Sequence, residues 1–231
     1  MKLELLRQGQ VLLTDKPLQW TSFDMVNKIR NAILKKYNLK KFKVGHAGTL
    51  DPLASGLLII CVGKATKTID KYQGLDKEYI GTITVGATTP SFDLETKIDQ
   101  TYPFVHITEN MIVQTAKHFV GKQWQKPPIF SAIKRNGKKL YEHARKGEVV
   151  EIKAREVEIK KFEILSINLP DIKFKVKVSK GTYIRSLAYD FGKALQSGGY
   201  LSELRRTKIG DFQIDDAIDI QTWINSLKDE D

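Results

Sequence analysis

The sequence has a single cysteine, Cys61, and its longest apolar run covers only the six residues Leu57 to Val62. One cysteine excludes a disulfide framework and is typical of a protein kept in a reducing cytosol. Six apolar residues are far too few to span a membrane, and the opening "MKLELLRQGQ" lacks the long apolar stretch of a signal peptide. A cytoplasmic protein with no membrane partner is therefore expected.

Motifs for cofactors and metals are also lacking. The sequence contains no G-x-x-x-x-G-K-[ST] phosphate loop, no G-x-G-x-x-G dinucleotide fingerprint and no G-x-S-x-G elbow. Its four histidines, at positions 46, 106, 118 and 143, have no metal-binding spacing, and the lone cysteine offers no zinc site. We therefore expect neither a cofactor nor a metal.

Positive charge is abundant, with a formal net charge of +11, and it is unevenly distributed. Residues 28–43 contain seven Lys or Arg and no acid, whereas residues 211–231 contain seven acids and one lysine. Residues 126–185 carry 16 basic and seven acidic side chains. Such segregation favours a polyanionic partner, while a high pI kept for solubility alone is the alternative.

The 231 residues, 41% of them apolar, are enough for one globular domain over 1–231. A helix is predicted over 21–37, where Thr21 and Asp24 have capping-box spacing. Its inward face is expected to contain Phe23, Val26, Ile29 and Ile33. The run 57–62 is predicted to be a buried strand. Helices and strands in mixed order, with several antiparallel hairpin signals, indicate the α+β class rather than alternating βα units.

Three further segments carry expectations. Asn136-Gly137 predicts a hairpin within 129–140. In the strand predicted over 171–179, apolar residues alternate with Lys173, Lys175 and Lys177, a stripe that is either RNA-facing or merely solvated. Residues 86–103 are predicted to form an exposed loop, whose length suggests a function.

One carboxylate lies where a Gly-rich loop meets the buried strand: Asp51, in front of Pro52. A carboxylate can act as a nucleophile at a sugar carbon, although glycoside hydrolysis usually uses two acids and this loop supplies one. An aspartate in such a loop is more often a turn or cap residue. Composition and periodicity leave both interpretations open.

A resemblance to a known family favours the interpretation of Asp51 as a nucleophile. "GHAGTLDPLASGLL", around Asp51, resembles the signature loop of the TruB family, the tRNA pseudouridine-55 synthases. Five more segments resemble the family's other motifs in the same order: "DKPLQWTSFDMVNKIR", "KEYIGTITVGATTPSFD", "PPIFSAIKRNGKKLYEHARKG", "SKGTYIRSLAYDFG" and "YLSELRRTKIGDF". Together they extend from about Leu12 to Ala217, nearly the whole chain.

The resemblance implies a pseudouridine synthase fold, with a mixed, mostly antiparallel sheet, flanking helices and a central RNA-binding cleft. It also implies an isomerase that converts one uridine of the tRNA T arm to pseudouridine. This reaction imports no group and needs no cofactor. The expected partner is tRNA, without a guide RNA and without an obligate protein partner, and a monomer is expected. A non-catalytic tRNA-binding or tRNA-folding factor with the same cleft is the alternative, and a guide-dependent relative is a third.

By motif position, the resemblance implies that Asp51 is the nucleophile, that Arg185 pairs with it, and that Tyr79 stacks on the extruded uracil and helps move the C5 proton. The remaining residues implied to bind substrate are His46, in the gap left by the flipped base, and Tyr183 and Leu204, which line the pocket. Lys16, Pro17 and Lys64 are implied to support the loop or contact RNA.

Two departures from the family pattern accompany these matches. Many relatives have glycine before the tryptophan of the first motif, whereas this chain has Gln19 before Trp20. Many relatives also continue into a C-terminal RNA-binding domain of the PUA type, which is not expected here. How tRNA is held would then depend on the basic segments of the catalytic domain.

Overall fold

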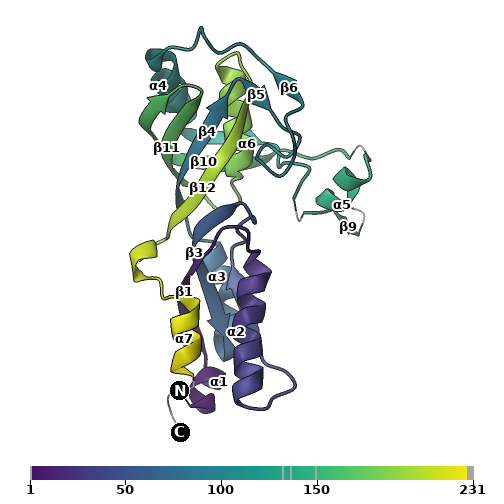
Figure 1. Ribbon diagram of the computed structural model, residues 1–231, viewed down its shortest axis with the longest axis vertical. Helices are drawn as coiled ribbons and strands as arrows, with labels where there is room; N and C mark the ends of the chain where they lie inside the picture. Colours follow the sequence, from purple (N-terminus) through teal and green to yellow (C-terminus); the bar gives the residue numbers. More distant parts are fainter. Residues whose placement is uncertain (1, 132, 136, 149, 228–231) are drawn as a thin grey trace. The chain divides into compact units, whose positions relative to one another are not determined.

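The computed structural model describes residues 2–131, 133–135, 137–148 and 150–227 (Figure 1). Its contacts divide the chain into two compact units. Unit 1 comprises Met1–Tyr79 and Leu204–Asp231, and unit 2 comprises Ile80–Glu203. Both boundaries fall inside strands, β4 (Lys77–Val85) and β12 (Gly199–Ile209). The single domain predicted for 1–231 therefore has two parts, each with buried side chains of its own.

Unit 1 is built around strand β3 (Ala54–Val62), which pairs antiparallel with β1 (Gln10–Lys16) and β2 (Val44–Ala47) and parallel with β12. Leu58, Ile60 and Val62 face one hydrophobic cluster, and Leu57, Ile59 and Cys61 face another. This two-sided burial explains the continuous apolar run of the strand. The other elements of unit 1 are α1 (Leu3–Gln8), α2 (Ser22–Lys36), the 3₁₀ turn η1 (Gly63–Thr68), α3 (Ile69–Gln73), β13 (Phe212–Gln213), the 3₁₀ turn η2 (Ile214–Asp216) and α7 (Ile220–Ser226).

Helix α2 begins at the predicted capping box. The Thr21 hydroxyl accepts a hydrogen bond from the Asp24 amide, and the Asp24 carboxylate accepts one from the Thr21 amide. The inward face differs from the prediction at one position, because Met25 is buried while Phe23 is 57% exposed. The ring of Phe23 lies 5.8 Å from the Arg30 guanidinium carbon instead, so the apolar ring has a partner on the helix surface.

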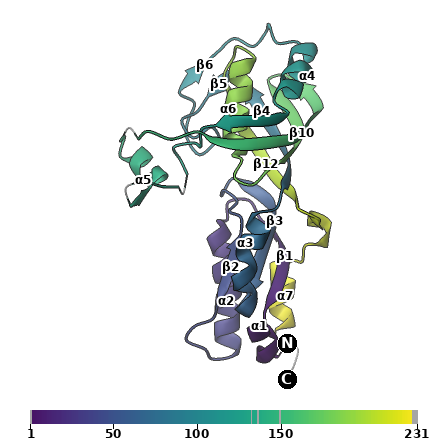
Figure 2. The same ribbon diagram turned by 180° about the vertical axis from the view of Figure 1, so that it is seen from behind.

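Unit 2 contains a sheet in the order β12-β4-β11-β10-β7, formed with β7 (Gly121–Gln125), β10 (Arg155–Asn168) and β11 (Asp171–Val178). Helices α4 (Glu109–His118) and α6 (Ile184–Ala194) pack against each other, and α4 packs on β10 (Figure 2). Phe191 of α6 reaches Phe162 of β10, with ring centroids 5.4 Å apart. The remaining elements of unit 2 are β5 (Ala87–Thr88), β6 (Gln100–Thr101), β8 (Lys134–Arg135), β9 (Lys138–Lys139) and α5 (Leu140–Arg145).

Several sequence predictions are confirmed. The class is α+β, and the sheet is mixed, since β3 pairs parallel with β12 while β10 pairs antiparallel with both β7 and β11. The 129–140 hairpin is present as the pair β8–β9, although Asn136 of its turn lies outside the described residues. The apolar face of β11 is buried, with Lys173 and Lys177 exposed opposite it. Of the helices within the described ranges, none is both long enough and apolar enough to cross a membrane.

Candidate active site

The loop between β2 and β3 holds Asp51, which is half-buried. Both of its neighbours are fixed by residues from the start of the chain. The Leu50 amide donates to the Ser22 hydroxyl at 2.8 Å, and the Pro52 carbonyl accepts from the Gln19 amide at 2.7 Å. Asp51 itself turns the chain, because its carbonyl accepts from the Ala54 amide. The turn role and the proposed nucleophile role are therefore compatible in one residue.

Gln19 adopts a left-handed backbone conformation, with φ at +66°. Glycine reaches this region without steric cost, whereas other L-residues lose about 1–2 kcal/mol there. This conformation explains why glycine suits the position in other sequences of this pattern. Because the Gln19 amide still reaches Pro52, the substitution leaves the connection to the Asp51 loop in place.

Two fully buried cations lie beneath the Asp51 loop. The guanidinium of Arg206 donates from Nε to the Leu57 carbonyl at 2.7 Å and from Nη2 to the Gly48 carbonyl at 3.0 Å, so it ties the start of the loop to strand β3. The Lys16 ammonium donates to the carbonyls of Pro17 and Trp20 at 2.9 and 2.6 Å. These backbone oxygens compensate part of the cost of burying two positive charges.

The same surroundings set the ionisation of Lys16. Burial lowers the pKa of the Lys16 ammonium to about 8, and repulsion from Arg206 acts in the same direction. The carboxylate of Asp51 opposes this shift of the pKa, so Asp51 and Lys16 attract each other within unit 1. Lys16, predicted to support the loop, is thus electrostatically coupled to the candidate nucleophile. Pro17 is exposed and contributes its carbonyl to this arrangement.

His46 lies on β2, paired with Ile60 of β3. Burial, followed by the charge of Arg206, lowers the pKa of its imidazole below the usual value of 6.5. Its buried Nδ1 has no hydrogen-bond partner among the residues that the structure describes. A neutral ring with an unused polar atom suits contact with a base better than contact with a phosphate.

Arg185, at the start of α6, is only 3% exposed, so it is not the surface charge that an arginine usually is. Its Nη1 donates to the carbonyls of Phe130 and Ser91 at 2.9 and 3.3 Å. Its Nε lies 3.7 Å from Oδ2 of Asp93, whose side chain is equally buried. The guanidinium is therefore held by one carboxylate and two carbonyls of unit 2.

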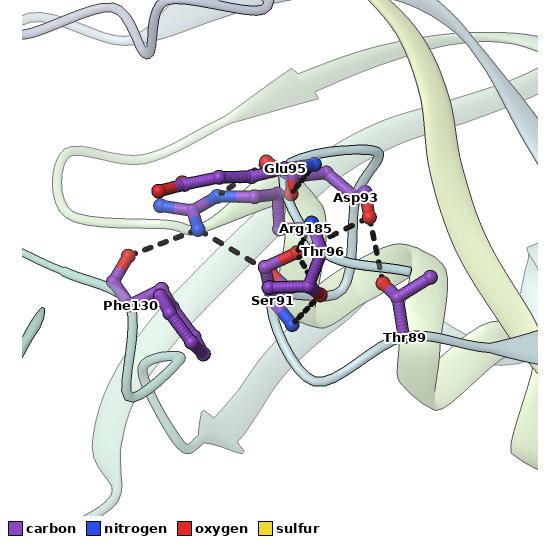
Figure 3. Close-up of polar contacts among 7 residues, drawn as sticks. All are labelled: Thr89, Ser91, Asp93, Glu95, Thr96, Phe130 and Arg185. Carbon is purple, nitrogen blue, oxygen red and sulfur yellow. Dashed lines mark hydrogen bonds and ion pairs between the residues drawn. The ribbon is translucent and has the colours of Figure 1, made fainter. Parts of the chain in front are cut away.

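The segment that carries Asp93 corrects only the first part of the exposed loop expected over 86–103, since residues 94, 95, 97–101 and 103 are exposed as predicted. Residues 87–89, 91 and 93 are buried, and β5 pairs with β6. The hydroxyls of Thr89 and Ser91 donate to the Asp93 carbonyl at 2.7 and 3.2 Å, while the Asp93 Oδ1 accepts from the Glu95 amide. Figure 3 shows these contacts turning the segment around Asp93. Polar residues are buried here because they hydrogen-bond one another.

Tyr183 occupies the N-cap position of α6 and is anchored through its backbone. Its amide donates to Oε1 of the buried Gln125 at 2.8 Å, and its carbonyl accepts from Nε2 of the same side chain at 3.0 Å. The guanidinium carbon of Arg155 lies 4.8 Å from the centre of its ring. Gln125 therefore fixes the start of the helix that presents Arg185 two residues later.

The remaining predicted residues lie as follows. Tyr79, on β4, is 8% exposed. Leu204, on β12, is half-buried and pairs with Ala54, so β12 connects it to the strand that follows Asp51. Lys64 is exposed on η1. Asp51 belongs to unit 1 and Arg185 to unit 2, and their pairing stays a prediction.

Sequence reasoning singled out neither Asp93 nor Arg206. Both lie inside the quoted motifs, Asp93 at the end of "ATTPSFD" and Arg206 in "LRRTKIGDF". Charged residues at these points are ordinary in sequence, and only their burial marks them as part of the site. Within the described ranges, no group of three or more His, Cys, Asp or Glu side chains is placed to hold a metal ion.

Comparisons with known proteins identify the family of the chain. The model described as TruB family pseudouridylate synthase (N terminal domain) matches residues 35–184. The chain belongs to the TruB family. A second model, described as tRNA pseudouridylate synthase B C-terminal domain, matches residues 185–230. The resemblance inferred from the six sequence motifs is thereby confirmed.

Full-length relatives support the TruB assignment. A Flavobacterium johnsoniae protein named tRNA pseudouridine synthase B is 61% identical over 222 residues, which cover 96% of this chain and 97% of that protein. A Phocaeicola vulgatus protein of the same name is 54% identical over 217 residues, covering 94% of this chain and 92% of that one.

A solved structure supports the fold. A chain in "Crystal Structure of a Cbf5-Nop10-Gar1 Complex" superposes with a TM-score of 0.71 and 32% identity. The superposition covers 97% of this TruB-family chain and 56% of that one, so this chain spans a little over half its length.

Proposed function

We propose that this TruB-family chain is a tRNA pseudouridine synthase that isomerises the uridine at position 55 in the T arm of tRNA. The observation that carries the proposal is the match of nearly the whole chain to relatives named tRNA pseudouridine synthase B, at up to 61% identity. In this proposal the enzyme acts on tRNA in the cytoplasm. The basic segments of the chain suit an RNA partner, and we expect a monomer that needs no obligate protein partner.

The reaction breaks the bond between C1′ and N1 of the uridine and forms one between C1′ and C5. The C5 proton leaves and N1 gains a proton, so atoms and charge balance without an oxidant, a reductant or a donated group. No water is consumed, so one carboxylate suffices where hydrolysis would use two. In this proposal Asp51 attacks the nucleotide at C1′ or C6, or removes a proton on the way to a glycal.

The target base has to leave the RNA stack before Asp51 reaches it, at a cost on the order of a few kcal/mol. In the proposal, stacking on Tyr79 returns about 1–3 kcal/mol. His46 fills the gap in the RNA, and Tyr183 and Leu204 line the pocket. Arg185 pairs with Asp51 and keeps it ionised. Lys16 and Pro17 support the loop, and Lys64 contacts phosphate.

The loop geometry supports the nucleophile role. The residues on both sides of Asp51 are held by Ser22 and Gln19, and Arg206 ties the start of the loop to strand β3, so the carboxylate lies on a fixed backbone. A fixed nucleophile saves the entropy of finding the reactive arrangement. The attraction between Asp51 and Lys16 favours the ionised carboxylate, which is the reactive form.

The test is release of tritium from C5-labelled uridine in a T-arm stem-loop transcript, with purified protein and without ATP, metal or guide RNA. Asp51→Asn should lower the rate by at least about 10³-fold, since it removes the nucleophile. Asp70→Asn is the matched control, because Asp70 is an exposed aspartate of the same unit. Full activity of Asp51→Asn would exclude Asp51 as the nucleophile.

The same assay separates the alternatives. Tight binding of the transcript without any tritium release would identify a non-catalytic tRNA-binding or tRNA-folding factor. The solved structure that this chain resembles is a Cbf5-Nop10-Gar1 complex, so partner proteins are a second alternative. Activity of this chain alone on bare transcript would exclude dependence on a guide RNA or on a partner protein.

A further inference from the structure

The rings of Phe92 and Tyr189 stack on each other in unit 2, with centroids 4.2 Å apart and planes inclined by 25°. Phe92 directly precedes Asp93 in the chain, and Tyr189 follows Arg185 by four residues on α6. Residues four apart on a helix lie on the same face, one turn from each other. The stack therefore joins the same two segments that the ion pair between Asp93 and Arg185 joins.

The backbone of Phe92 is strained. Its φ of +64° lies in the left-handed region, and the other non-glycine residues with positive φ in the described ranges are Gln or Asn. This region costs an L-residue about 5- to 30-fold in the folding equilibrium. Two hydrogen bonds keep Phe92 there, because its amide donates to the Thr89 carbonyl at 3.1 Å and its carbonyl accepts from the Leu201 amide at 2.9 Å. Strain of this kind persists where the surroundings fix it, and it clusters at functional sites.

The conformation of Phe92 determines the direction of the Asp93 side chain. A rotation of the Phe92 backbone toward an ordinary conformation would swing the next carboxylate away from Arg185. Oδ2 of Asp93 lies 3.7 Å from Nε of Arg185, close to the outer limit of an ion pair, so little displacement is tolerated. The stack on Tyr189 opposes this rotation with a side-chain contact to α6, and stacked aromatic rings stabilise beyond the area that they bury.

A second aromatic pair on the same helix provides a contrast. The ring of Phe119 lies 5.9 Å from that of Phe191 of α6, and Phe119 is half-buried like Phe92. Phe119 follows α4 with an ordinary φ of −77°. This pair has the character of interior packing, whereas the pair of Phe92 and Tyr189 combines a strained backbone with a place beside both members of a buried ion pair.

We propose that Phe92 and Tyr189 are positioning residues, whose stacked rings hold the Asp93 carboxylate against Arg185. This inference rests on the proposed function, in which Arg185 pairs with Asp51. Neither ring has to touch the RNA, because the effect reaches the substrate through Asp93 and Arg185. Loss of the stack should therefore slow the reaction without weakening the binding of RNA.

The experiment measures kcat and KM for tritium release from the labelled T-arm stem-loop. Phe92→Ala should lower kcat about 10- to 100-fold, because a guanidinium displaced by about 1 Å loses its alignment. KM should stay within about twofold, since no contact to RNA is removed. Tyr189→Phe keeps the ring and should keep kcat. Phe119→Ala is the matched control, which should lower the melting temperature and leave kcat unchanged.

A double-mutant cycle separates positioning from packing. If the stack acts through Asp93, adding Phe92→Ala to Asp93→Asn should change kcat by less than about threefold, whereas independent effects would multiply. Phe92→Gly tests the ring separately from the strain, because glycine adopts the left-handed conformation without steric cost. It also serves where Phe92→Ala does not fold, and its kcat should be as low. Circular dichroism checks that each variant is folded.

Four kinetic results would overturn the proposal: wild-type kcat in Phe92→Gly, an equal loss of kcat in Tyr189→Phe, an equal loss in Phe119→Ala, or multiplied effects in the double variant. Hydrogen exchange of the Arg185 Nε–H, followed by NMR, adds a measurement that needs no turnover. Exchange should be at least about tenfold faster in Phe92→Gly and within about twofold of wild type in Phe119→Ala. Equal exchange in the two variants would also overturn it. A wild-type protein that releases no tritium would refute the proposed catalysis, and the exchange measurement would still decide the positioning role.

Discussion

The ion pair between Asp93 and Arg185 offers the sharpest test of how unit 2 holds Arg185. Asp93→Asn keeps the size of the side chain and an oxygen that can accept from the Glu95 amide. It replaces the charged Oδ2, 3.7 Å from the Arg185 Nε, with a neutral group. Arg185 stays protonated, so its buried charge loses a compensating carboxylate.

The geometry sets the size of the effect. Two unit charges 3.7 Å apart attract by about 4–5 kcal/mol at an effective dielectric constant of about 20. Removing one partner of a buried pair typically costs about 3–5 kcal/mol. Because Nη1 of Arg185 keeps its bonds to Ser91 and Phe130, we expect the lower end, a loss of about 3 kcal/mol in the free energy of unfolding.

Urea unfolding followed by circular dichroism measures this loss as a midpoint lowered by about 1–2 M, at a slope of about 2 kcal/mol per molar. Glu95→Gln is the control, since Glu95 is exposed in the same loop and its pair with Arg145 is worth about 0–1 kcal/mol. A misplaced guanidinium should also slow tritium release by about 10²-fold. Equal stability of Asp93→Asn and Glu95→Gln would refute the reasoning.

Two further predictions concern residues of β1 and β3 that lie next to the Asp51 loop or its supporting cations. Gly56→Ala places a methyl group 2.3 Å from the Arg206 carbonyl oxygen at φ +108°, so thermal unfolding should show a loss above about 3 kcal/mol in the free energy of unfolding. The control Gly147→Ala, at φ +67° with open space around it, should lose only about 1–2 kcal/mol. Equal losses in the two variants would contradict this prediction. Between its folded pKa of about 8 and its unfolded value of 10.5, Lys16 binds more protons in the unfolded chain, so its contribution to stability rises with pH across that window. The free energy of unfolding of the wild type, measured in urea, should therefore rise relative to that of Lys16→Met as pH rises, by up to about 3 kcal/mol. If the two proteins showed the same dependence of stability on pH, the lowered pKa of Lys16 would be contradicted.

The sequence predicts the elements whose causes are local. The capping box at Thr21 starts α2, the apolar run makes β3 a buried strand, and the Asn-Gly pair predicts the hairpin of β8 and β9. Phe23 shows the limit of periodicity, because its ring finds a partner in Arg30 on the helix surface. Periodicity reports which face is apolar, while a cation–π contact depends on where one arginine happens to lie.

Burial of charge is the property that sequence patterns conceal. Asp93 lies in a stretch of polar residues that indicates an exposed loop, yet the hydroxyls of Thr89 and Ser91 donate to its carbonyl and let the segment fold inward. Arg206 donates to carbonyls at positions 48 and 57, about 150 residues away in the chain. No local sequence signal can indicate contacts over such a separation. Long-range pairing of this kind appears only once the strands are assembled.

Asp51 and Arg185, the two charged residues of the proposed mechanism, are held by separate networks. Within unit 1, Arg206 and Lys16 hold the loop of Asp51 through backbone carbonyls and an attractive charge. Within unit 2, Asp93 and the carbonyls of Ser91 and Phe130 hold Arg185. Each charged group is thus oriented before RNA arrives, so binding energy is not consumed in ordering them. Substitutions in the unit 1 network should change only the orientation of Asp51, and substitutions in the unit 2 network only that of Arg185. Their effects on the reaction rate therefore report separately on the nucleophile and on the arginine.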